Sequence, residues 1–149
     1  MSKRIPIGLQ LWSLRDDCKK DLPGTLKAVA DMGYQGVETA GTYDLTGAQW
    51  AQLLKANKLV VSSAHLGITA IQPAALDATL ALYGAMGCKR LIVPGLPGEY
   101  TATLDGFRRA CDEINAAALK GAALGFQFGF HNHSGEFKPV EGQIPYENS

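Results

Sequence analysis

The sequence predicts an α/β fold in which parallel strands alternate with helices. Four times, a helix-like stretch rich in Ala and Leu ends in Gly or Asn and is followed at once by a short β-prone run. These junctions lie at residues 30–38, 53–65, 83–95 and 122–133. Gly and Asn tolerate the left-handed backbone that ends many helices. We therefore expect this conformation at Gly33, Asn57, Gly87 and Gly125.

The first half of the chain predicts a strand followed by two helix–strand units. The run 5–12 alternates apolar residues and has no helix before it, which is typical of an opening strand. A first helix is expected over 22–32, because Pro23 is tolerated in a first helical turn. Thr46 is a suitable N-cap for a second helix over 48–56.

The second half repeats the pattern. Pro73 is expected to begin a third helix over 73–86, and Thr101 or Thr103 a fourth that ends near Ala123. The resulting order is β-α-β-α-β-α-β-α-β, with five strands and four helices. Strands that alternate with helices through short loops favour a parallel sheet with right-handed crossovers.

Length and composition place the chain among single-domain globular proteins. It has 149 residues, of which 46% are hydrophobic and 19% charged. We treat 1–149 as one domain, with a polar tail over 134–149 that is expected to pack poorly. No apolar run approaches the roughly 20 residues of a membrane-spanning helix, so no membrane partner is expected.

The net charge and the cysteines indicate which partners and which cellular compartment to expect. Fourteen basic residues balance fourteen acidic ones, so the net charge gives no sign of nucleic-acid binding, and no nucleic-acid partner is expected. Three widely spaced cysteines fit neither a disulfide framework nor a zinc knuckle and favour a reducing compartment. The N-terminus lacks the pattern of a signal peptide, and a cytoplasmic location is expected.

Polar residues gather where the predicted strands end. Alternation in the last strand directs three phenylalanines toward the helices and leaves His131 and His133 on the opposite face. His65 and Glu38 end two earlier strands. Strand carboxyl ends are where α/β enzymes build their sites, and imidazole with carboxylate suits either acid–base chemistry or a divalent metal.

Each of these residues also has a purely structural interpretation. A histidine at a strand end can be a hydrogen-bonded structural residue, and Glu38 can cap the next helix or pair with a lysine. Glu136 can be a solvated loop acid. Trp12 can stack on a sugar or serve ordinary packing.

The combination of motifs resembles one superfamily. The segments IGLQLWSLRDD (7–17), DLPGTLKAVADMGYQGVETAG (21–41), SAHLG (63–67) and FGFHNHSGEF (128–137) are similar to those of xylose-isomerase-like TIM barrels, the sugar phosphate isomerases and epimerases. The resemblance implies a (β/α)₈ barrel that acts on a sugar, keto-sugar or inositol derivative by proton transfer next to a carbonyl. It also implies a divalent metal: Mn²⁺, Mg²⁺, Co²⁺ or Zn²⁺.

The resemblance implies roles for individual residues. Those implied to be catalytic are His131, His133 and Glu38. Those implied to bind substrate are Gln10, Trp12, Glu38, His65 and Asn132. His131 and Glu136 are the implied metal ligands, although His131 stands where many relatives carry a glutamate. The ligands that relatives take from later strands have no counterpart here.

Length limits what this chain can do alone. A complete barrel of this kind has ~250 residues, so we expect a partial barrel that lacks strands six to eight, is inactive by itself, and self-associates through exposed barrel edges. A non-catalytic sugar-binding or assembly half-barrel is the alternative, and an abasic-site endonuclease relative is a further one. A flavodoxin-like open sheet is the alternative fold.

Overall fold

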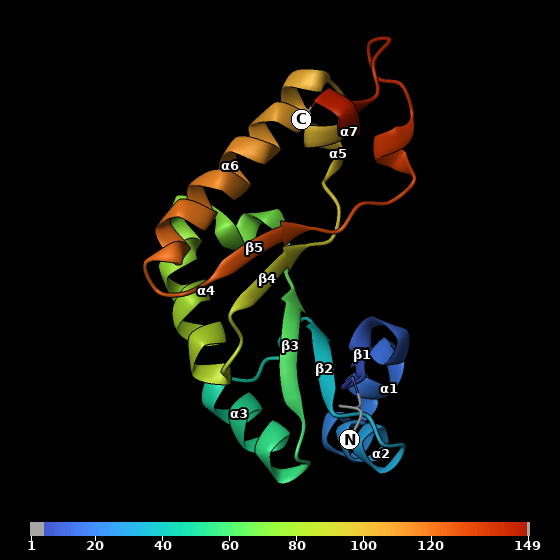
Figure 1. Cartoon of the computed structure of the whole chain (residues 1–149), viewed down its shortest axis with the longest axis vertical. Coiled ribbons are helices and arrows are strands. Elements are labelled where there is room, and N and C mark those ends of the chain that lie inside the picture. The colour runs from blue at the N-terminus through green and yellow to red at the C-terminus, as the bar shows by residue number, and fades with distance from the viewer. Residues whose placement is uncertain (1–4, 149) are drawn as a thin grey trace. The chain divides into compact units, whose positions relative to one another are not determined.

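The computed structural model describes residues 5–148 and divides the chain into two compact units. The first unit contains residues 5–65 together with Ala81–Lys89. The second contains Leu66–Leu80 and the chain from Arg90 onward. Figure 1 labels the helices and strands of both units.

The first unit is built on three parallel strands. They are β1 (Gly8–Gln10), β2 (Gly36–Ala40) and β3 (Val60–His65). β2 lies in the middle and pairs in parallel with both of the others. The helical elements are η1 (Leu11–Leu14), α1 (Arg15–Lys20), α2 (Leu22–Asp31), α3 (Gly47–Ala56) and the last part of α4 (Pro73–Met86).

The second unit is built on β4 (Arg90–Val93) and β5 (Gln127–Phe130), which pair in parallel. Its helical elements are η2 (Ile68–Ile71), the first part of α4, α5 (Gly98–Thr101), α6 (Leu104–Ala122), η3 (Gly135–Phe137) and α7 (Pro145–Asn148). The predicted α/β class with parallel strands is confirmed. Residues 11–20, which the sequence analysis did not assign to a helix, are largely helical.

Side chains at the predicted positions start the helices. Thr46 forms a capping box with Gln49 at the start of α3. Thr103, one of two candidates, caps α6 by accepting a hydrogen bond from the Gly106 N–H at 3.1 Å. Asp21 caps α2 in the same way, which the sequence analysis did not anticipate.

The predicted helix ends are confirmed at three of four positions. The φ angles of Gly33, Gly87 and Gly125 are +93°, +86° and +76°. The prediction for Asn57 is wrong, because its φ is −97° and Lys58 adopts the left-handed conformation instead. The Asn57 side chain and backbone N–H both donate to the Leu53 carbonyl, which keeps Asn57 in helical register.

One buried hydroxyl gives a testable prediction about stability. Thr39 of β2 is fully buried, and its Oγ1 has no hydrogen-bond partner within residues 5–148. Because a desolvated, unpaired hydroxyl is costly, Thr39→Val is expected to raise the free energy of unfolding by about 1 kcal/mol. Urea denaturation followed by circular dichroism measures this change.

A second threonine supplies the matched control. Thr46→Val removes a hydroxyl that accepts from the Gln49 N–H, so it is expected to lower the free energy of unfolding by about 1 kcal/mol. A loss of stability for Thr39→Val equal to that of Thr46→Val would contradict the expected effect.

The three cysteines differ in accessibility and give a second prediction. Cys18 and Cys88 are buried, whereas Cys111 is partly exposed, and none of the three is in a disulfide bond within residues 5–148. Burial raises the pKa of the Cys18 thiol above its usual value. This effect is larger than the lowering caused by the hydrogen bond with Tyr43. Thiolates are the reactive form. In a short iodoacetamide pulse read by peptide mass spectrometry, Cys111 is therefore expected to be alkylated first. Equal labelling of Cys18 would contradict this.

The segment after β5 makes defined contacts in the second unit. The Glu141 carboxylate accepts a hydrogen bond from the Leu104 N–H at 3.1 Å. The rings of Phe137 and Tyr146 lie 4.7 Å apart. Glu136 is buried as well. Within residues 5–148, no helix has the length and apolar character needed to cross a bilayer.

Candidate functional site

The carboxyl ends of β1, β2 and β3 bring three predicted site residues together. Gln10 is the register partner of Glu38, and its Nε2 donates to Glu38 Oε1 at 2.6 Å. His65, at the end of β3, places Nε2 3.1 Å from the same oxygen. Three of the predicted site residues, Gln10, Glu38 and His65, are therefore in contact within this unit.

Ser63 completes this cluster on the other side of the carboxylate. Its Oγ donates a short hydrogen bond to Glu38 Oε2. Ser63 was not among the site residues predicted from the sequence. We call Gln10, Glu38, Ser63 and His65 the Glu38 cluster.

The geometry of the cluster favours the tautomer of His65 that carries its proton on Nε2. An ionised carboxylate only accepts hydrogen bonds, so His65 Nε2 must be a donor toward Glu38 Oε1. Gln10 Nε2 and His65 Nε2 lie 3.5 Å apart as two donors that converge on one acceptor. His65 is 9% exposed and the Glu38 side chain 22%. The pair is thus mostly shielded from water, where charge–dipole interactions are stronger than on the surface.

Trp12 is not a core residue. It lies on η1 rather than on the strand, and it is 58% exposed. The guanidinium of Arg15 lies 5.1 Å from the centre of its ring and also donates to its backbone carbonyl. The tryptophan ring is therefore available at the surface, with one cation held against it.

The remaining predicted site residues lie in the second unit. His131, Asn132 and His133 follow β5 and are exposed. The His131 N–H donates to the Val93 carbonyl, and the rings of the two histidines lie 4.9 Å apart. Their convergence with Glu38 and His65 stays a prediction.

Glu136 has a different environment from the histidine rings. Its carboxylate accepts a hydrogen bond from the His133 backbone N–H at 2.7 Å, and it is 6% exposed. It lines a cavity of about 450 Å³ with residues of β5, α6, α7 and the loop after β4. The other lining residues are Leu96, Phe107, Ala110, Cys111, Ile114, Asn115, Phe130 and Tyr146. Its contacts thus support a role in fixing the turn after β5.

Metal ligation by His131 and Glu136 stays a prediction. Among residues 5–148 there is no group of three or more histidines, cysteines or acids arranged to hold a metal ion. His131 and His133 are two neighbouring imidazoles, and a tetrahedral zinc site, for example, requires four ligands.

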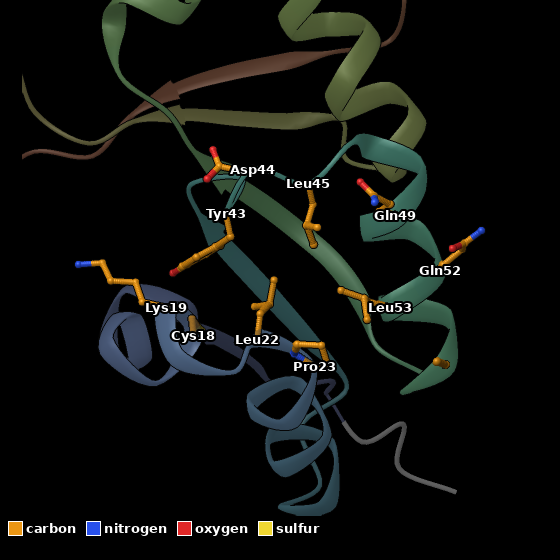
Figure 2. Close-up of a pocket in the computed structure, with 11 residues that line it drawn as sticks. Cys18, Lys19, Leu22, Pro23, Tyr43, Asp44, Leu45, Gln49, Gln52 and Leu53 are labelled. Carbon is orange, nitrogen blue, oxygen red and sulfur yellow. The ribbon is translucent and has the colours of Figure 1, made fainter.

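A groove between helices of the first unit was not predicted from the sequence (Figure 2). Its volume is about 690 Å³, and its walls come from α1, α2, α3 and the loop after β2. Tyr43 and Asp44 in that loop have φ angles of +50° and +58°. Burial raises the pKa of Tyr43 to about 12. No local pattern signals this groove, because its residues come from three separate segments.

The chain is similar to solved structures of one class of protein. Protein-family models give no match, and no curated protein matches either. A sugar phosphate isomerase/epimerase from Parabacteroides distasonis is similar over 99% of this chain and 62% of its own, with 22% identity and a TM-score of 0.81. A second such structure from the same organism is similar over 95% of this chain and 63% of its own, with 29% identity and a TM-score of 0.76.

A more distant structure identifies the architecture. A fusion of a xylose isomerase-like TIM barrel with a 4-hydroxyphenylpyruvate dioxygenase is similar over 83% of this chain and 21% of its own, with 14% identity and a TM-score of 0.53. The fold is part of a TIM barrel. The predicted resemblance to xylose-isomerase-like barrels is confirmed at this level. The chain spans less than two thirds of the length of both P. distasonis structures.

Proposed function

We propose that this chain carries part of the sugar-binding site of an isomerase or epimerase that moves a proton next to a carbonyl group. The observation that carries the proposal is the Glu38 cluster, in which a shielded carboxylate holds a histidine and a glutamine at strand carboxyl ends. Such ends are the usual place for sites in TIM barrels. The similarity to two structures of sugar phosphate isomerase/epimerases supports the same class.

The proposed chemistry uses the residues as acceptors and donors. A carboxylate such as Glu38 removes a proton from the carbon beside the carbonyl, and the electrons of that bond form an enediolate. Return of the proton to the neighbouring carbon isomerises the sugar, and its return to the opposite face epimerises it. We assign substrate hydrogen bonds to Gln10, His65 and Asn132, ring stacking to Trp12, and proton transfer to oxygen to His131 and His133.

The metal and the compartment stay proposals. A divalent ion would stabilise negative charge on the substrate oxygens. His131 and Glu136 are the candidate ligands in this chain, and the hydrogen bond from the His133 N–H would hold the Glu136 carboxylate in place. Three free cysteines suit a reducing compartment, which supports the cytoplasm.

Sugar binding tests the proposal directly. We would titrate the ¹⁵N-labelled chain with D-fructose and D-fructose 6-phosphate, with and without Mg²⁺, and use D-glucitol, which lacks a carbonyl, as the matched ligand. The expected result is saturable shift changes at Gln10, Glu38 and His65 for a keto-sugar and weaker changes for D-glucitol. Absence of shift changes at these residues with all three ligands would refute the proposal.

Self-association is a separate expectation. Ile5 and Ile7, beside β1, are 82% and 59% exposed, and exposed strand edges with apolar side chains attract further strands. Sedimentation velocity over a hundredfold range of concentration is expected to show dimers or larger species. A single monomer peak throughout would contradict it. The sugar titration described above can be carried out whether the chain is a monomer or an oligomer.

A further inference from the structure

We propose that Ser63 is a positioning residue, whose hydroxyl fixes the carboxylate of Glu38 so that one oxygen faces Gln10 and His65. The proposal deepens the proposed function and rests on it for its biological meaning. Its structural basis is independent of any sugar. It consists of a β-bulge, two serine hydrogen bonds and the division of contacts between the two carboxylate oxygens.

The bulge decides which serine faces Glu38. β2 and β3 pair in register at Val37 and Val61, and an unshifted ladder would next pair Glu38 with Ser62. The register instead shifts, and Glu38 pairs with Ser63. An extra residue in one strand of a ladder re-aims the side chains that follow it, and such bulges are common next to active sites.

Ser62 stabilises the bulge that it occupies. Its Oγ donates to the Val37 carbonyl at 3.1 Å, immediately before the register shift. That carbonyl belongs to a fully buried residue, and an unpaired buried carbonyl would be costly. The two serines thus have different tasks. Ser62 bonds the backbone at the bulge, and Ser63 reaches the carboxylate.

The Ser63 hydrogen bond determines the rotation of the carboxylate. The terminal torsion of a glutamate is broad, so the side chain alone does not select an orientation. Gln10 and His65 both approach Oε1, whereas Ser63 donates to Oε2. Hydrogen-bond donors on both oxygens restrict rotation of the carboxylate group, whereas donors on one oxygen leave the other oxygen free to move. Ser63 thereby orients His65 through Glu38.

The spectroscopic signature of His65 tests this role. Imidazole ¹⁵N shifts report which ring nitrogen carries the proton, and a hydrogen bond from His65 Nε2 to the ionised Glu38 carboxylate places that proton on Nε2. The variants are Ser63→Ala, which removes the donor, and Ser63→Thr, which restores it. Thr39→Val is the matched control, because it removes a hydroxyl from β2 beside Glu38 that has no hydrogen-bond partner in the described part of the chain. Circular dichroism confirms that each variant is folded.

The expected result is specific to the hydroxyl of Ser63. In the native chain and in Thr39→Val, the Nε2–H form should predominate above the pKa of the imidazole. Ser63→Ala should give a mixture of tautomers, and Ser63→Thr should restore the native spectrum. An unchanged tautomer in folded Ser63→Ala would overturn the proposal. If Ser63→Ala does not fold, Ser63→Cys decides in its place, because a thiol of similar size is a weak donor.

Sugar titration separates this proposal from the proposed function. If the native chain binds a keto-sugar, Ser63→Ala should bind it about tenfold more weakly, since a hydrogen bond to a charged group is lost. If the native chain binds no sugar but Ser63→Ala changes the tautomer, positioning stands and the proposed function fails. If sugar binds equally to both chains and the tautomer is unchanged, positioning fails alone.

Discussion

Replacement of Trp50 by alanine is expected to lower the free energy of unfolding by about 4 kcal/mol, the typical cost of removing a buried tryptophan. Trp50 lies on α3 and is fully buried in the first unit. Its Nε1–H donates to the Thr42 carbonyl at 2.9 Å. That carbonyl also accepts from the Leu45 N–H, so it stays paired in the variant. The expected loss therefore comes mainly from packing.

Trp12 is the matched control for this experiment. The same substitution there removes a side chain that is 58% exposed, so it is expected to cost less than about 1 kcal/mol. Urea denaturation followed by circular dichroism measures both variants without relying on tryptophan fluorescence. Because domains are stable by about 5–15 kcal/mol, the Trp50 variant should unfold at clearly lower urea. A loss no larger than that of Trp12→Ala would show that the packing argument is wrong.

Much of the fold could be predicted because its signals are local. The start of α3 is encoded by the capping Thr46 and by Gln49 three residues later. Three helix ends are encoded by glycine, the residue type with free access to positive φ, at Gly33, Gly87 and Gly125. Helix α1 was not anticipated, because its short charged sequence has no apolar periodicity.

The site could be predicted only in part. The positions of Glu38 and His65 follow from the rule that polar residues at strand carboxyl ends line the site, and their grouping with Gln10 follows from register. The contact of Ser63 with Glu38 depends on a bulge, and no residue type marks a bulge in this strand. The groove in Figure 2 was missed for a related reason, since its walls depend on tertiary packing.

Replacement of Glu38 by glutamine is expected to have the largest effect on sugar binding. The amide keeps the shape of the side chain but loses the negative charge, and its NH₂ group is a donor. At least one of Gln10, Ser63 and His65 would then meet a donor instead of an acceptor. Loss of a charge-assisted hydrogen bond reduces affinity by about tenfold to a hundredfold.

The experiment compares Glu38→Gln with Glu99→Gln. Glu99 is exposed on α5, so its substitution changes net charge equally without touching the Glu38 cluster. Keto-sugar affinity measured by NMR titration should fall only in the Glu38 variant. The imidazole ¹⁵N spectrum of His65 should change in that variant as well, because Glu38 is the acceptor that selects the Nε2–H form. Equal affinities for the two variants would mean that the carboxylate of Glu38 serves the packing of the strand ends and does not contact sugar.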